Sequence, residues 1–167
     1  MEDSNAAHTT PVGGNMGSLN GTAAHKVDIS TRNRLEGQHI IQRILLVEDD
    51  LALAALEAEF LTVHGYTVVT VHSGELAIMA LRHSIPDLVV LDLELTGSVN
   101  GWEVLQALRA SATIPVLLTT SSATAVRTYK RTHGETKFTL DHLPKPYPMQ
   151  TLLKRVKRML TIAPQSQ

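Results

Sequence analysis

The sequence predicts an α/β protein in which five parallel strands form one sheet and five helices cover both of its faces, a doubly wound arrangement. Short apolar runs alternate along the chain with longer stretches in which apolar residues recur at helical spacing. The run DLVVLD at 87–92 is apolar on successive residues, as is typical of a parallel strand buried on both faces. No internal repeat is visible.

Each apolar run is a predicted strand, and a helical stretch follows it. The strands are expected at 43–47, 67–71, 87–92, 115–120 and 140–143. The helices are expected at 53–63, 73–81, 101–110, 123–133 and 149–161. Gly65 is expected to end the first helix in a left-handed conformation. The apolar face of that helix is assigned to Leu53, Leu56, Phe60 and Val63.

The composition is that of a globular protein without cysteine chemistry. The chain has 167 residues, of which 43% are hydrophobic and 19% are charged, and its formal net charge is −1. This length suits one ordinary domain, and the near-zero charge predicts no direct contact with nucleic acid or a membrane. The lack of cysteine excludes disulfides, thiol nucleophiles and thiolate metal sites. Neither a signal peptide nor a membrane-spanning stretch is recognisable, so a cytoplasmic protein is expected.

The chain is expected to divide into three parts. Residues 1–40 are rich in Gly, Asn, Ser, Thr and Ala and follow neither a helical nor a strand period, which predicts a disordered N-terminal tail. Residues 41–162 make up the predicted domain, and residues 163–167 form a short C-terminal tail.

Acidic side chains follow two of the predicted strands, at the points where these strands end. Glu48 and Asp49 follow the first strand, and Asp92 ends the third. Because the carboxyl ends of parallel strands meet at one edge of the sheet, these groups are expected to lie close together. Like charges at such distances raise one another's pKa unless a cation neutralises them, and Mg²⁺ or Mn²⁺ suits carboxylate oxygens.

The fourth and fifth strands bring a hydroxyl and an amine, Thr120 and Lys145, to the same edge. Together with the carboxylates, these groups predict a phosphoryl-binding site that combines a nucleophile, a metal, a charge partner and a hydrogen-bond donor. Each residue also has an ordinary interpretation: Asp50 as a helix cap, Thr120 as a strand residue and Lys145 as a solvated cation. The suitable residue types at four strand ends together favour the functional interpretation.

Four motifs carry these residues: ILLVEDD at 44–50, PDLVVLD at 86–92, PVLLTTS at 115–121 and LPKPY at 143–147. In this order the motifs resemble the receiver domain of response regulators in bacterial two-component systems. The resemblance covers residues 42–162 and includes HGY at 64–66. It implies a flavodoxin-like fold with strand order 2-1-3-4-5, in a stand-alone receiver of the chemotaxis type.

The resemblance implies a role for each acidic residue. Asp92 is the implied phosphoacceptor, which attacks the phosphorus of a phosphohistidine on a histidine kinase or a phosphotransfer protein. Asp49 is an implied ligand of Mg²⁺ (or Mn²⁺), with Glu48 acting directly or through water. Asp92 and the backbone carbonyl of Glu94 are the other implied ligands.

The remaining implied roles belong to the ends of the fourth and fifth strands. Lys145 pairs with the phosphoryl oxygens, and its bond to Pro146 is expected to be cis. The Thr120 hydroxyl and the Ser121 backbone N–H donate hydrogen bonds to the phosphoryl group. His142 occupies the position of the aromatic residue that moves with Thr120 when a receiver switches.

Three features depart from the family pattern. The loop at 95–101 is one residue longer than usual and has Thr96 in place of a proline, and the connection from Thr120 to Lys145 is about three residues longer. His142 replaces a tyrosine or phenylalanine. Because an imidazole titrates near neutrality, partner binding is expected to depend on pH around the ordinary pKa of histidine. The alternative is that His142 stays outward and solvated in both states and takes no part in the switch.

The function that follows is a phosphorylation switch rather than an enzyme. Its signal is expected to leave through contacts with a downstream protein or through a phosphorelay, from a monomer or weak dimer. An alternative is a degenerate receiver that acts as a phosphorylation-independent binding module, and the full set of site residues argues against it. Another doubly wound class, a flavin carrier or an aspartyl-phosphate phosphatase, lacks support from the residues after the first strand, where Glu48 and Asp49 stand.

Overall fold

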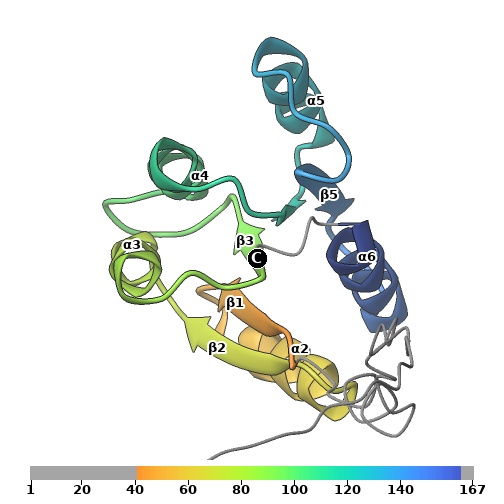
Figure 1. Ribbon diagram of the computed structural model, residues 1–167. Coiled ribbons are helices and arrows are strands. Elements are labelled where there is room, and N and C mark those ends of the chain that lie inside the picture. Colours follow the sequence, from red (N-terminus) through yellow and green to blue (C-terminus); the bar gives the residue numbers. More distant parts are fainter. Residues whose placement is uncertain (1–40, 163–167) are drawn as a thin grey trace, which may run out of the picture. The chain divides into compact units, whose positions relative to one another are not determined.

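A five-stranded parallel sheet forms the centre of residues 41–162, the part of the chain that the computed structural model describes (Figure 1). The strands lie in the order β2-β1-β3-β4-β5. The elements are β1 (Arg43–Val47), α2 (Leu51–Val63), β2 (Thr67–Val71), α3 (Gly74–His83), β3 (Leu88–Asp92), α4 (Gly101–Ser111), β4 (Val116–Thr120), α5 (Ala123–Thr132), β5 (Leu140–Pro144) and α6 (Met149–Ile162). The predicted fold class and strand order are therefore confirmed. The tails predicted at 1–40 and 163–167 lie outside the described residues.

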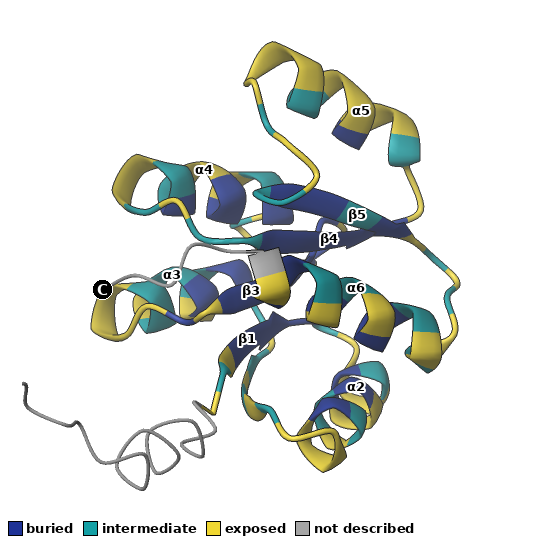
Figure 2. Ribbon diagram, turned by 45° about the vertical axis from the view of Figure 1, so that its right-hand side comes forward, coloured by how far each residue is buried: buried dark blue, intermediate teal, exposed yellow. Residues whose placement is uncertain are grey.

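Helices cover the two faces of the sheet in separate groups. Helices α3 and α4 lie on one side and α2 and α6 on the other, and α5 contributes Val126 to the core that α3 and α4 share. Every residue of β3 and β4 is buried, as expected for central parallel strands (Figure 2). The β2 strand lies at an edge and is only partly covered. The sheet therefore fixes the ends of β1, β3 and β4 within a packed core.

Local signals in the sequence explain where three helices begin. The Asp50 side chain accepts hydrogen bonds from the first turn of α2, and Ser73 caps α3 in the same way. Asn100 and Glu103 form a reciprocal capping box at the start of α4. Gly65 follows α2 with a φ of +94°, the left-handed conformation predicted for it.

The apolar face predicted for the first helix is wrong at two of its four residues, although Phe60 packs against the core. Leu56 and Val63 are 52% and 71% exposed, and the buried face of α2 is formed by Ala54, Glu57 and Leu61. The sequence of α2, LALAALEAEFLTV, is apolar on nearly every side, so helical spacing alone did not identify the stripe that faces the sheet. Glu57, a charged residue type on the buried face, was therefore not predicted to be a buried residue.

The long connection between β4 and β5 is held by one arginine of α4. The Arg109 side chain donates to Glu135 at 2.6 Å, and to the backbone carbonyls of Ile114 and Thr139 at 2.9 Å each. The Thr139 hydroxyl also donates to Glu135, at 2.6 Å. These contacts lie before β4 and β5, at the amino-terminal edge of the sheet, opposite to the edge where the acidic residues gather.

None of the helices within residues 41–162 is long and apolar enough to cross a membrane.

Candidate functional site

The predicted site residues gather where β1, β3, β4 and β5 end. Strand register aligns Val47 of β1 with Leu91 of β3, and Asp92 with Thr119 of β4. It also aligns Thr120 with Pro144 of β5. The residues that follow these positions therefore meet at one edge of the sheet, as the sequence predicts.

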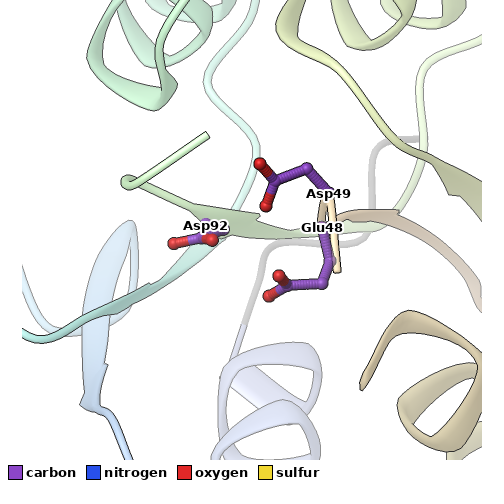
Figure 3. A group of neighbouring side chains, drawn as sticks. All are labelled: Glu48, Asp49 and Asp92. Atoms are coloured by element: carbon purple, nitrogen blue, oxygen red, sulfur yellow. The ribbon is translucent and has the colours of Figure 1, made fainter. Parts of the chain in front are cut away.

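Three carboxylates form an acidic cluster at this edge. Figure 3 shows Glu48 and Asp49 reaching from the end of β1 toward Asp92. One oxygen from each carboxylate lies within 4.8 Å of the other two, and Glu48 and Asp92 are each only 2% exposed. Hard oxygen ligands at this spacing fit a divalent ion such as Mg²⁺ after small side-chain rotations, because its ligand distances are about 2.1 Å.

Lys145 connects two of these carboxylates. Its ammonium nitrogen lies 2.8 Å from an oxygen of Asp92 and 3.1 Å from one of Glu48. Burial lowers the pKa of Lys145, but the bonds to Asp92 and the charge of Glu48 outweigh this effect and raise it. Lys145 therefore remains a cation in contact with Asp92. The bond from Lys145 to Pro146 is cis, as expected.

The carboxylates were expected to raise one another's pKa, which is confirmed for Glu48 and wrong for Asp49. Burial raises the pKa of Glu48, and the neighbouring charge of Asp92 raises it further. The pKa of Asp49 is instead lowered, because the hydroxyl and the backbone N–H of Thr96 both donate to it, at 2.5 Å and 2.8 Å. Thr96, noted in the sequence for replacing a proline, thus stabilises the charged form of Asp49.

The side chain of Glu94 occupies the hydrogen-bond donors at the end of β4. One of its carboxylate oxygens accepts a bond of 2.8 Å from the Ser121 backbone N–H, a bond from the Ser121 hydroxyl and a longer contact of 3.4 Å from Thr120. The Ser121 hydroxyl is the main cause of a lowered pKa at Glu94. The Glu94 backbone N–H donates in turn to Asp92, at 2.9 Å. A negatively charged group thus already occupies the hydrogen-bond donors that were expected to hold a phosphoryl group.

His142 lies in β5, away from the acidic cluster. It pairs in register with Leu118, two residues before Thr120. Its side chain is half-buried, and its Nδ1 has no hydrogen-bond partner within the described part of the chain. Burial lowers the pKa of His142, so the ring stays neutral to a lower pH than an ordinary histidine.

Glu57 and Tyr147 form a buried polar pair next to the site, which the sequence did not predict. Glu57 of α2 is completely buried and accepts a hydrogen bond from the hydroxyl of Tyr147, two residues after Lys145. The spacing of three residues between Ala54 and Glu57 indicates that both lie on the same face of α2. This spacing predicts a buried Glu57 only if the buried face of α2 is known to contain Ala54.

Comparisons with known proteins agree with this geometry. The family model for the response regulator receiver domain matches residues 44–157. The DNA-binding response regulator MtrA of Mycolicibacterium paratuberculosis is 34% identical over 119 residues, which cover 71% of this chain and 51% of MtrA. The transcriptional regulatory protein CpxR of Escherichia coli is 35% identical over 120 residues, covering 72% and 50%. A response regulator receiver protein from Sinorhizobium medicae has a similar structure, with a TM-score of 0.62 at 25% identity, covering 74% of this chain and 97% of that one.

The chain belongs to the response regulator receiver domain family, whose members act in phosphorylation-dependent two-component signalling and bind Mg²⁺ at an acidic pocket. Receiver domains are signalling proteins and not enzymes in the usual sense. The chain spans about half the length of the curated relatives it matches.

Proposed function

We propose that this receiver is active: Asp92 accepts a phosphoryl group from a histidine kinase or a phosphotransfer protein, with Mg²⁺ or Mn²⁺ bound by Asp49, Asp92 and the backbone carbonyl of Glu94. Glu48 takes part directly or through water. The observation that carries the proposal is the contact of 2.8 Å between Lys145 and Asp92 inside the acidic cluster. A buried carboxylate beside both a fixed cation and a metal-binding cluster is equipped to become a phosphorylated nucleophile.

In the proposed reaction, a carboxylate oxygen of Asp92 attacks the phosphorus of the phosphohistidine. The O–P bond forms as the P–N bond breaks, and the leaving imidazole nitrogen keeps the electron pair and takes up a proton from water. A bound metal would neutralise charge on the phosphoryl oxygens. Lys145 turns its ammonium toward the new phosphoryl group, while Thr120 and the Ser121 N–H donate hydrogen bonds to it.

The signal is proposed to leave through protein contacts or a phosphorelay, with movement of Thr120 and His142 altering the surface of α5, β5 and α6. MtrA is a DNA-binding regulator, but the chain matches only about half of it. The described domain is proposed not to contact nucleic acid itself. Two of the basic side chains of α6, Arg155 and Arg158, contact the buried Asp141 of β5, which reduces the free positive charge of this helix.

Intact-mass measurement with acetyl phosphate and Mg²⁺ tests the proposal. The parent chain is expected to gain the mass of one phosphoryl group, only when the metal is present, and Asp92→Asn is expected to gain none. Asp87→Asn, at the residue that precedes the same strand, is a matched control that should be labelled like the parent. Equal labelling of Asp92→Asn and the parent would place the phosphoryl group elsewhere. No labelling of the parent would favour a phosphorylation-independent binding module.

Glu94→Ala is expected to speed phosphorylation by a small donor several-fold. The substitution frees the donors of Thr120 and Ser121 and removes a negative charge that repels the incoming phosphate. The backbone carbonyl remains, so Mg²⁺ affinity should change little. Phosphorylation rates at several donor concentrations measure the effect, with Glu59→Ala on the exposed side of α2 as the control. A rate at or below that of the parent would show that the Glu94 carboxylate does not compete with the phosphoryl group.

A further inference from the structure

The pair formed by Glu57 and Tyr147 has no place in the site described so far. Glu57 is completely buried, and one of its carboxylate oxygens accepts the hydrogen bond of Tyr147. The other oxygen, Oε2, is buried without a hydrogen-bond partner within residues 41–162. Burying a carboxyl in this way costs free energy that an apolar side chain of similar size would avoid. Packing of α2 against the sheet therefore does not explain why a glutamate stands here.

The partner of Glu57 belongs to the turn that carries Lys145. This turn, Lys145–Pro146–Tyr147, connects β5 to α6. At its start, the backbone N–H of Lys145 donates to the carbonyl of Thr120 at 2.9 Å. At its end, Tyr147 packs against the core between α2, α6 and the sheet, and its hydroxyl reaches Glu57. The turn is thus held at two points, one on β4 and one on α2, and the Lys145 side chain extends from between them.

The ammonium of Lys145 depends on this turn for its position. It lies within 3.1 Å of both Glu48 and Asp92, although its side chain is 21% exposed and connected through four flexible methylene groups. Holding a long side chain in one geometry costs rotamer entropy, and a fixed backbone at its base reduces the number of alternatives. A turn anchored at one end only would let the ammonium leave the carboxylates.

We propose that Glu57 and Tyr147 are positioning residues, whose hydrogen bond fixes the Lys145–Pro146–Tyr147 turn so that the Lys145 ammonium stays in contact with Asp92. The role in Lys145 placement rests on the contacts of the described residues, and its effect on phosphorylation rests on the proposed function. The pair touches neither the metal ligands nor the phosphoryl donors in the contacts described above, so it acts through Lys145.

The first test measures Lys145 itself and needs no phosphorylation. The parent, Tyr147→Phe, Glu57→Leu and Glu57→Gln are treated briefly with a water-soluble amine-acylating reagent, and modification of each lysine is followed by peptide mass mapping. Tyr147→Phe and Glu57→Leu are expected to increase the acylation rate of Lys145 several-fold, because an ammonium freed from its carboxylates is more accessible and loses its proton more easily. Glu57→Gln keeps a hydrogen-bond acceptor and should resemble the parent. Lys154, exposed on α6, is the internal control that should not change.

An unchanged rate at Lys145 in Tyr147→Phe overturns the proposal. Should either single variant fail to fold, the double variant Glu57→Leu/Tyr147→Phe replaces it, because removing both partners leaves no unpaired buried carboxyl. The double variant is expected to show the same increase at Lys145, and parent-like acylation of Lys145 in it would likewise overturn the proposal.

The second test is a double-mutant cycle on the rate of phosphorylation by acetyl phosphate with Mg²⁺. Tyr147→Phe is expected to slow the reaction about tenfold, since misplacing a reacting group by about 1 Å can cost up to about a hundredfold. In a Lys145→Ala background, the same substitution should have no further effect. An equal slowing in both backgrounds would show a general structural role instead. If the parent were not phosphorylated at all, the proposed function would fail while the acylation result still decided the positioning role.

Discussion

Replacing Glu57 by glutamine is expected to remove a loss of stability that the parent protein suffers as pH rises through the acidic range. Burial raises the pKa of Glu57 from 4.5 to about 7, while the hydrogen bond from Tyr147 offsets only part of the rise. The other charged groups that act on it are Glu48, Asp92 and Lys145. Between these two pH values the folded protein keeps a proton that the unfolded chain releases. The free energy of unfolding therefore falls with rising pH, by about 3 kcal/mol in total.

Folding favours the protonated form of Glu57, so the free energy of unfolding decreases as the pH rises. The stabilisation is complete below pH 4.5, where both states hold the proton, and is lost once pH passes about 7, where neither state does. Urea unfolding of the parent and Glu57→Gln between these limits measures the effect, since other groups contribute equally to both proteins and cancel. Glu59→Gln, an exposed neighbour on α2, should run parallel to the parent. Parallel curves for Glu57→Gln as well would show that Glu57 is ionised in the folded protein throughout.

Gly101→Ala is expected to lower the free energy of unfolding by about 3 kcal/mol and to slow phosphorylation. The start of α4 packs directly against the backbone of the phosphoacceptor: a Cβ at position 101 would lie 2.2 Å from the Asp92 carbonyl oxygen and 2.6 Å from the Cα of Leu93. Backbone atoms cannot rotate away, so either α4 or the end of β3 must move. Both movements weaken the core, and the second also displaces Asp92.

Gly134→Ala is the matched control. Its Cβ would meet nothing within 4 Å, and its φ of +64° predicts a cost of only about 1 kcal/mol. Denaturant unfolding compares the two variants, and phosphorylation by acetyl phosphate reports the position of Asp92. A Gly101→Ala protein as stable as the Gly134→Ala protein would contradict the close approach between α4 and β3.

The strand ends could be predicted from sequence because their signals are local. The run that ends in Asp92 is apolar on consecutive residues, and the segment around Lys145 has prolines on both sides. The edge at which parallel strands end then follows from general rules of α/β topology. Neither step requires knowledge of how a particular side chain is turned.

The parts that could not be predicted depend on tertiary packing. Glu57 was missed because α2 is apolar on nearly every side, and the face that meets the sheet is chosen by contacts from β1, β2 and α6. The bonds from Thr96 to Asp49 depend on the path of a loop, and spacing carries no information on that path. The placement of Glu94 on Ser121 depends on a side-chain rotamer, which a sequence pattern does not specify.

The hydrogen bonds of Arg109 to Glu135, Ile114 and Thr139, here called the Arg109 clamp, decide where the connection between β4 and β5 can change in length. The extra residues between β4 and β5 are tied down at the amino-terminal edge of the sheet, where Arg109 joins Glu135 and Thr139. Beyond the clamp, β5 resumes its register with β4 and delivers Lys145 to the far edge. We therefore expect extra residues inserted before Gly134, or a fluorophore attached there, to be absorbed before the strand begins, so that the geometry at the other end of the sheet is unchanged.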